Sequence, residues 1–362
     1  MAGNSLGTIF SITTWGESHG PALGVIIDGC PPNISLSVKD IQKELDRRKP
    51  VDPKISTTRK ESDKVEILSG VFNGKTTGTP ISVVIFNEDT RSQDYEKIKN
   101  SFRPGHADFT YEMKYGIRDY RGGGRSSGRE TGSRVIAGAI AGKVLKSLPQ
   151  TKDLQVYGHT IQVGDIHTDS YYTAKNLDRK FIEKNPLRCA SKKAFKEMYS
   201  LVEKIQKEGD SIGAVIEIII ENPPIGLGEP VFDKLNADLA KAFMSIGAVK
   251  GVEFGLGFEV ACMKGSENND QMIVNKKGKI TFTSNNSGGI LGGISNGNTI
   301  IARLAIKPTP SIAHLQHTVT SSGQKTGIQV HGRHDVCLAP RIIVVAEAMA
   351  KTVILDHVLR MK

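Results

Sequence analysis

The sequence predicts an α+β fold whose two halves are related by a pseudo-twofold axis. Two observations point to it. Apolar runs typical of strands alternate with helical segments along the 362 residues, and several segments of the first half recur in the same order in the second. A chain of this length buries a large core. We expect a single domain over residues 1–362, with pseudo-repeats at roughly 1–150 and 205–362 and a linking segment at 151–204.

The first half begins with a short apolar run that the turn signal DGCPP closes. Ser37 is a suitable N-cap for the helix that follows, and Pro50 is a suitable stop. A later helical segment is rich in glycine and alanine, which suits close packing. In order, we predict a strand at 25–27, a helix at 37–50, a strand at 79–86 and a helix at 131–145.

The rest of the chain continues this alternation. The first helix predicted there has apolar residues such as Phe195, Met198 and Val202 at helical spacing, which indicates an amphipathic helix. Residues 264–287 are polar and rich in turn residues, so we expect a loop or a mobile hairpin there. We predict strands at 154–163, 212–224 and 299–306, and helices at 192–209, 232–247 and 340–355.

The internal repeat rests on collinear matches. GESHGPALGVIIDGCP (16–31) aligns with GDSIGAVIEIIIENPP (209–224), and GVFNGKTTGTPI (70–81) aligns with GILGGISNGNTI (289–300). The alternative is chance similarity among glycine-rich turns, and the conserved order of the segments favours duplication over it. The remaining matches are Ile41 with Leu235, Leu45 with Leu239, and Arg125 with Arg333.

The repeat also bears on His19, which lies between glycines in GESHG. The second copy, GDSIG, has Ile212 at the same position. A turn that needs only its glycines accommodates either residue, so the turn does not require the histidine. This favours a functional role for His19, although divergence of the two copies would also produce the difference.

Composition narrows the class of protein. With 24% charged and 38% hydrophobic residues, the chain is globular rather than disordered. Four widely separated cysteines predict neither a disulfide framework nor a zinc site, and they favour a reducing, cytoplasmic environment. We expect no secretory signal and no membrane-spanning segment. P-loop, GxGxxG, HExxH and GxSxG motifs are absent, and the nine histidines lack metal-site spacing.

The net charge of +10 indicates either a bias toward solubility or an anionic partner. The arginines gather in glycine-rich stretches at 45–50, 117–134 and 332–335, a pattern that favours compact anions over a nucleic-acid backbone. Ser126 and Ser127 precede a predicted helix, where hydroxyl and backbone donors suit a phosphate. A solvated surface loop and a basic nucleic-acid-binding protein remain the alternatives.

Three further stretches carry candidate groups. His106 follows Pro-Gly in RPGHAD, where a lone histidine is more often structural. Asp335 lies in GRHDVC and suits either a catalytic base or a helix cap. KPTPSI (307–312) follows a predicted strand and forms either a phosphate site or a rigid turn.

Long motifs resemble a known family. GESHGPALGVIIDGCPP, RPGHADFTYEMKYGIRDYRGGGRSSGRET and GRHDVCLAPRIIVVAEAM are similar, in sequence and spacing, to the three signature regions of chorismate synthases. The similarity extends from Gly3 to about Arg360. It implies a layered α+β sandwich of antiparallel sheets and helices with internal pseudo-twofold duplication, and a cytoplasmic homotetramer without nucleic-acid or membrane partners.

The resemblance also implies an activity. It is that of a carbon–oxygen lyase that converts 5-enolpyruvylshikimate-3-phosphate to chorismate and phosphate by anti-1,4-elimination. This is the last step of the shikimate pathway of aromatic amino acid biosynthesis. The family depends on reduced FMN without net redox change. No dinucleotide-binding domain is visible, which favours an external flavin reductase and leaves NADPH only as a source of reductant.

Residue roles are carried over position by position. His19 would protonate the departing phosphate, His106 would act at the N1/C2 carbonyl edge of the flavin, and Asp335 would lie near flavin N5. Lys54 stands where family members often have arginine, and lysine keeps the charge but loses the fork geometry. The implied substrate-binding residues are Arg48, Lys54, Arg129 and Arg134. The implied FMN-binding residues are Arg125, Ser126, Ser127, Gly247, Ala248, Gly292, Lys307, Pro308, Thr309, Pro310, Ser311 and Arg333. No metal is implied.

Overall fold

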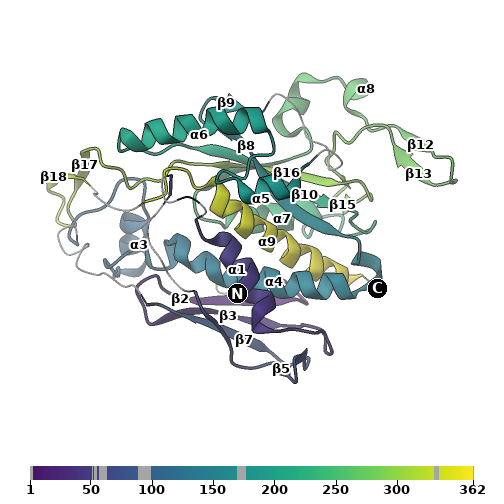
Figure 1. Cartoon of the computed structure of the whole chain (residues 1–362), viewed down its shortest axis with the longest axis horizontal. Helices are drawn as coiled ribbons and strands as arrows, with labels where there is room; N and C mark the ends of the chain where they lie inside the picture. The colour runs from purple at the N-terminus through teal and green to yellow at the C-terminus, as the bar shows by residue number, and fades with distance from the viewer. Residues whose placement is uncertain are drawn as a thin grey trace.

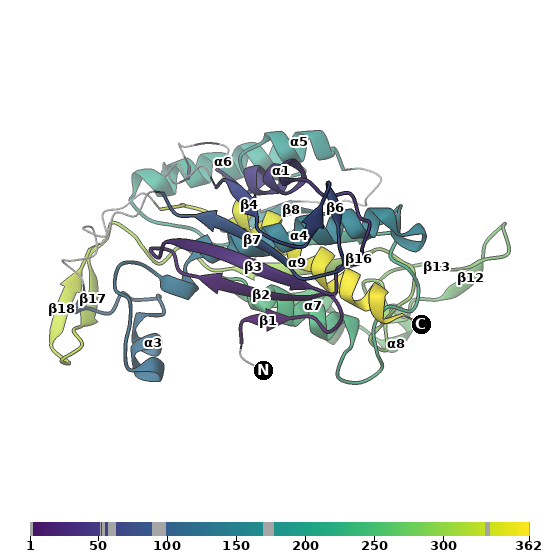
Figure 2. The ribbon, with the colours of Figure 1, turned by 90° about the horizontal axis from the view of Figure 1, so that it is seen from below.

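Two five-stranded antiparallel sheets enclose a layer of helices in the described part of the chain (Figure 1). The computed structural model describes residues 3–50, 52, 55–56, 63–88, 99–168, 177–329 and 334–361. This layered α+β sandwich is the predicted fold class. Figure 2 views the molecule from below, with the first sheet in front of the helices.

The two sheets have equivalent strand orders. The first runs β1 (Ser5–Leu6), β2 (Ser11–Gly16), β3 (Ala22–Asp28), β7 (Ile81–Phe86), β4 (Val65–Ile67). The second runs β9 (Ile166–His167), β8 (Gln155–Val163), β10 (Ala214–Glu221), β16 (Ile300–Ile306), β11 (Val249–Phe254). A short hairpin precedes the fourth strand of each: β5 (Val71–Phe72) with β6 (Lys75–Thr76), and β14 (Ile290–Leu291) with β15 (Ile294–Ser295).

Burial follows the same phase in both copies. Leu23, Val25 and Ile27 of β3 are buried in the core, as strand alternation requires. Their counterparts in the aligned sequence are buried in the same way; they are Ile216, Ile218 and Ile220 of β10. The predicted duplication therefore extends from the sequence to strand order and to the side of the sheet that each residue faces.

The helices between the sheets also pair across the halves. α4 (Thr131–Ser147) packs on β2, β3 and β7, whereas α9 (Ala339–Arg360) packs on β8 and β10. α1 (Val38–Arg48) and α7 (Leu235–Met244) pack against α4 and α9 respectively. α4 and α9 cross closely, because a Cβ at Gly138 would lie 2.3 Å from the Cα of Ala348. The two equivalent helices thus meet at the centre of the sandwich.

Local sequence signals explain where these helices begin. The Asp40 carboxylate accepts hydrogen bonds from the Ser37 backbone N–H (2.9 Å) and Oγ (2.8 Å) at the start of α1. This is the predicted cap. In the second half, the Ser191 Oγ accepts a hydrogen bond from the Ala194 N–H at the start of α6 (Lys192–Lys207). Met198 and Val202 lie on the buried face of α6.

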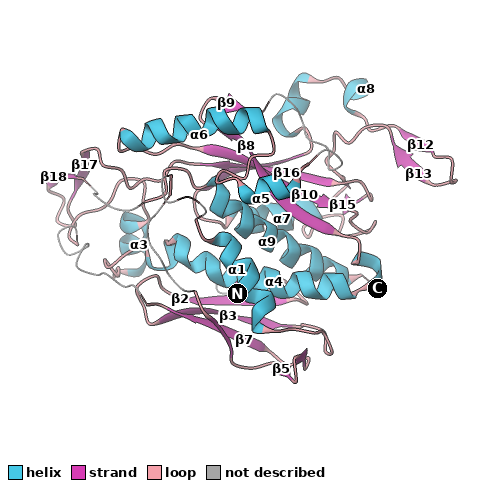
Figure 3. Ribbon diagram, viewed as in Figure 1, coloured by secondary structure: helices cyan, strands magenta, loops and turns pink. Residues whose placement is uncertain are grey.

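Several segments differ from the expectations or were not predicted. The segment 151–204 contains the predicted strand as β8, which belongs to the second sheet, and α5 (Arg179–Lys184), which was not predicted; the predicted helix α6 begins in it and ends at Lys207. Residues 264–287, predicted as a loop or a mobile hairpin, contain a hairpin of β12 (Met272–Val274) and β13 (Ile280–Phe282), preceded by α8 (Gly265–Asn268), which was not predicted (Figure 3). α3 (Asp108–Tyr115) and the hairpin of β17 (Gln316–Val319) and β18 (Lys325–Ile328) lie at the opposite end of the molecule (Figure 1).

Within the described ranges, no helix is both long enough and apolar enough to cross a membrane.

Candidate active site

The candidate residues lie in loops at the ends of strands and helices that are equivalent in the two halves. His19 is in the turn between β2 and β3, and the GDSIG turn precedes β10. The GDSIG turn contacts two later connections of its own half, because the Ser211 Oγ donates to the Thr309 carbonyl (2.6 Å) and the Ile212 N–H donates to the Val336 carbonyl (2.9 Å). Connections that are far apart in sequence therefore converge at one end of the sandwich.

The His19 ring is fixed by its neighbours. Its Nδ1 lies 2.9 Å from the Oγ of Ser18, which is buried. The backbone of Gly122 packs against the same edge of the ring, since a Cβ at Gly122 would come within 2.4 Å of Nδ1. Only glycine fits there without displacing the imidazole.

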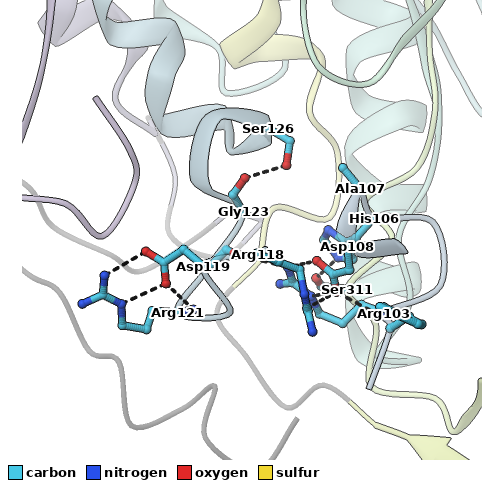
Figure 4. A network of polar contacts seen from close by, with 12 residues as sticks. Arg103, His106, Ala107, Asp108, Arg118, Asp119, Arg121, Gly123, Ser126 and Ser311 are labelled. Atoms are coloured by element: carbon cyan, nitrogen blue, oxygen red, sulfur yellow. Dashed lines mark hydrogen bonds and ion pairs between the residues drawn. The ribbon is translucent and has the colours of Figure 1, made fainter. Parts of the chain in front are cut away.

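A buried ion pair holds the segment that bears His106 (Figure 4). The Arg103 guanidinium donates to both carboxylate oxygens of Asp108, at 2.8 and 2.7 Å, and to the Gly122 carbonyl at 3.1 Å. Burial opposes ionisation of Asp108, but the hydrogen bonds and charge of Arg103 outweigh it and lower its pKa. Arg103 thus joins the His106 segment to the glycine that packs on His19.

His106 faces the residues that follow β16. Its Nε2 lies 2.8 Å from the Oγ of Ser311, and Figure 4 shows the two side chains together. Burial, together with the positive charge of Arg103, lowers the pKa of His106 to about 4. The imidazole is therefore neutral at physiological pH, so that one ring nitrogen donates a hydrogen bond and the other accepts one.

Lys307 connects two of the predicted FMN-binding segments with the segment that bears His106. Its Nζ donates to the Gly105 carbonyl (2.6 Å), and its backbone N–H donates to the Ala248 carbonyl (2.9 Å). Space beside Gly247 is open, because a Cβ there would meet only the Ser126 carbonyl, at 4.0 Å. A ligand can approach the backbone of this region closely.

Asp335 is buried and immobilised just before α9. Its carboxylate accepts a hydrogen bond from the Arg341 guanidinium at 2.6 Å, and its backbone carbonyl accepts one from the Thr309 Oγ1 at 2.7 Å. His334 lies beside it, where burial lowers the pKa of the imidazole although Asp335 opposes the effect. Thr309 and Ser311 therefore connect the surroundings of Asp335 and His106.

Cations are concentrated on the other side of Asp335. Arg48 and Arg129 are both buried and both pair with the Asp63 carboxylate. The pKa of Arg48 is lowered, first by burial and then by the nearby charges of Arg341 and Arg129. Because guanidinium groups stay protonated in proteins, this crowding leaves an electropositive site that suits an anionic ligand.

Other predicted residues are engaged within the protein. The Arg125 guanidinium donates to the Thr14 and Gly16 carbonyls of β2, at 3.0 and 3.1 Å. The Ser126 Oγ donates to the Gly123 carbonyl, and the Ser127 Oγ caps the turn at Arg129. In this structure these side chains shape the 123–130 loop, together with hydrogen bonds from the Ser126 N–H to the Gly123 carbonyl (2.8 Å) and from the Ser127 N–H to the Gly124 carbonyl (3.3 Å).

Two predicted residues lie at opposite ends of α7, and of these only Gly292 is far from Gly247 and Ala248. Arg134 pairs with Glu130 (3.0 Å) and donates to Ser245 Oγ (2.6 Å) at the end of α7. Gly292 is at the start of α7, since its neighbour Gly293 packs on Lys234. α7 has 10 residues, so about 15 Å of helix separates Gly292 from Gly247 and Ala248.

The remaining predictions are placed as follows. Pro310 packs on Gly105, where a Cβ would meet it at 2.7 Å, and Pro308 lies beside Gly213. Lys54 and Arg333 lie outside the described residues.

Sequence reasoning missed several partners at this site. Asp63 is a buried residue with a positive φ of 49°, and nothing in its surrounding sequence marks it. Arg341 follows the GRHDVC motif but belongs to a helix that was treated only as a structural element. Ser211 could have been found, because it is the counterpart of Ser18 in the repeated turn.

Comparisons with known proteins agree over the whole chain. The family model described as chorismate synthase matches residues 10–359. A chorismate synthase of Methanosarcina mazei is 53% identical over 361 residues, which cover 99% of this chain and 97% of the relative. One of Pelagibacter ubique is 53% identical over 362 residues, covering 100% of this chain and 99% of the relative.

A solved structure, described as a crystal structure of chorismate synthase, superposes with a TM-score of 0.77 and 32% identity. The match covers 98% of this chain and 93% of that one. Sequence relatives of nearly the same length, a family model and a solved structure thus identify the same family. The chain belongs to the chorismate synthase family of enzymes.

Proposed function

We propose that this protein catalyses the anti-1,4-elimination of phosphate from 5-enolpyruvylshikimate-3-phosphate, giving chorismate, with reduced FMN and no net redox change. The observation that carries the proposal is the arrangement of His19, His106 and Asp335 around converging loops, beside the crowded guanidiniums of Arg48 and Arg129. The substrate bears one phosphate and two carboxylates, which these cations match.

The residues present fit FMN. A flavin needs close backbone approach, donors for its phosphate and a hydrogen-bonding partner at its ring edge. The open space at Gly247, the loop at 123–127 ahead of α4 and the neutral His106 meet these three needs. When bound, reduced FMN would supply an electron as phosphate leaves and would recover it with the C6 hydrogen at N5, so that a hydrogen that is not acidic can be removed without net redox change.

The chain's own groups then divide the work. Ser18 and Gly122 orient His19 through its Nδ1 edge, so the imidazole gives a proton from Nε2 to the departing phosphate. Ser311 orients His106 through Nε2, so Nδ1 serves the N1/C2 carbonyl edge of the flavin. Arg341 fixes the Asp335 carboxylate, which relays the proton near N5.

The test is an anaerobic assay of phosphate release from the substrate. We expect release with reduced FMN and none with oxidised FMN, because the flavin must supply an electron. His19→Ala should slow release strongly while the variant stays folded. A lack of phosphate release with reduced FMN and substrate would refute the proposed reaction.

The same assay addresses the source of the reductant. We propose an external flavin reductase, so NADPH with oxidised FMN should give no release until a reductase is added.

We also propose a homotetramer, to be checked by sedimentation of the purified protein. A cytoplasmic location is supported by the four free cysteines, three of them buried, and fractionation of cells would test it.

A further inference from the structure

Asn87 joins the turn that bears His19 to a buried arginine. It directly follows β7, and its backbone N–H donates to the Pro21 carbonyl at 3.0 Å. The side-chain Nδ2 donates to the carbonyls of Glu17 (3.1 Å) and Gly20 (2.8 Å), which flank His19. The side-chain Oδ1 accepts a hydrogen bond from the Arg129 Nε at 3.0 Å.

The chemistry of these contacts selects an amide. The two turn carbonyls require donors, and the guanidinium requires an acceptor, so the nitrogen and oxygen of the amide have one workable orientation. A carboxylate in the same place would pair with Arg129 but would oppose the two carbonyls. An aliphatic side chain would leave all three groups without this partner.

The internal repeat indicates that the turn does not need this arrangement in order to fold. In the aligned halves, His19 corresponds to Ile212 and Asn87 corresponds to Ile306. The second copy of the turn forms with neither residue. His19, the candidate proton donor, and the amide occur together in the first half. We therefore attribute the role of the amide to His19 and not to the turn itself.

Arg129 is itself held in place. It is buried, and its Nη1 pairs with the Asp63 carboxylate, which also lies 3.7 Å from Arg48 Nη1. We propose that Asn87 is a positioning residue, which holds His19 at a set position relative to the arginines that bind the substrate anions. This inference rests on the proposed function, since it gives Asn87 its effect through the proton that His19 donates.

The test is a double-mutant cycle in the anaerobic assay. Asn87→Ala should lower kcat by about 10–100-fold, because a misplaced catalytic group of this kind costs about that factor. KM for the substrate should change much less, since Arg129 keeps Asp63. In the His19→Ala background, Asn87→Ala should lower kcat less than about twofold further, because the group that it positions is gone.

Two further variants guard against misfolding. Asn87→Asp keeps the volume and the contact with Arg129 but loses both donated hydrogen bonds, so it should lose kcat as Asn87→Ala does. Asn285→Ala is a matched control, because its Nδ2 also donates to a carbonyl, that of Thr299 (2.8 Å), at the start of the second-half strand β16. It should keep wild-type kcat, with any effect confined to the thermal unfolding midpoint.

The outcomes distinguish a failure of the inference about Asn87 from a failure of the proposed function. If His19→Ala is slow but Asn87→Ala has wild-type kcat, the inference about Asn87 fails and the proposed function stands. Equal loss from Asn87→Ala with and without His19 would also overturn the inference. If His19→Ala itself turns over at the wild-type rate, the proposed role of His19 fails and the inference fails with it.

Discussion

His106 is a histidine whose surroundings suppress its charge. Burial, with help from Arg103, lowers its pKa to about 4, whereas an unperturbed histidine titrates near about 6.5. A depressed histidine pKa favours the folded protein when the ring is neutral. Its contribution to stability is therefore complete above about pH 6.5 and is lost as the pH falls toward 4.

We expect the His106 ring to remain neutral down to about pH 4 in the folded protein. Selective ¹³C-histidine labelling and NMR would follow the titration, with His106→Asn assigning the signal. The histidine signals that His106→Asn leaves in place are the control within the same sample. A His106 midpoint near about 6.5 would contradict the neutral imidazole assigned to the site.

At this scale, sequence reasoning identified groups but not their partners. His19, His106 and Asp335 stand out because each lies in a glycine-rich or turn motif. Asn87 and Asp63 do not stand out, because their roles depend on contacts with Arg129, which is 42 and 66 residues away in the chain. Such pairings exist only once the strands and helices have brought the residues together.

The crossing of α4 and α9 depends on the absence of a side chain. Gly138 has no room for a Cβ, which would overlap the Cα and Cβ of Ala348 at 2.3 Å. The atoms in the way belong to a helix backbone, so they cannot move without separating the helices.

Gly138→Ala should therefore destabilise the protein by about 1–3 kcal/mol, as overpacking in a core does, even though alanine favours helix by about 1 kcal/mol. The midpoint of urea unfolding would report the change. Gly142→Ala on the same helix is the matched control, because its Cβ would meet only the flexible side chain of Lys351, at 3.4 Å. Equal or higher stability for both variants would show that the crossing is not tight.

Elements with a long, regular pattern were predictable, and short ones were not. β3, β7, β10, β16 and the helices α1, α4, α6, α7 and α9 match their predicted segments because apolar period and caps mark them. β1, β4 and β9 have only two or three residues, too few to show a period. They form because a neighbouring strand offers unpaired backbone groups.

At the scale of the whole molecule, an ion network joins the two halves. Arg47 of α1 pairs with Glu347 of α9 at 2.8 Å and with Glu183 of α5, and Glu183 also pairs with Arg188. Burial would raise the pKa of Glu183, but the hydrogen bond from Arg47 and the charges of Arg188 and Arg47 lower it to about 2. The carboxylate therefore stabilises the fold only while it is ionised.

We expect the free energy of unfolding to fall as the pH drops from about 4.3, the pKa of glutamate in an unfolded chain, toward about 2. Glu183→Gln should be less stable at neutral pH and should lose part of this acid dependence. Urea midpoints measured across this range would show it. Glu197→Gln, which removes an exposed carboxylate from α6, is the control for the loss of one negative charge.

The positions of the two sheets along the chain determine which sheet can form first during synthesis. The first sheet draws its five strands from residues 5–86, and the second from residues 155–306. The first can therefore pair while the ribosome is still making the rest of the chain. The face of α4 that carries Gly138 must wait for α9, whose first residue is Ala339. During this interval the nascent chain exposes an apolar helix face, and we expect chaperones to matter most then.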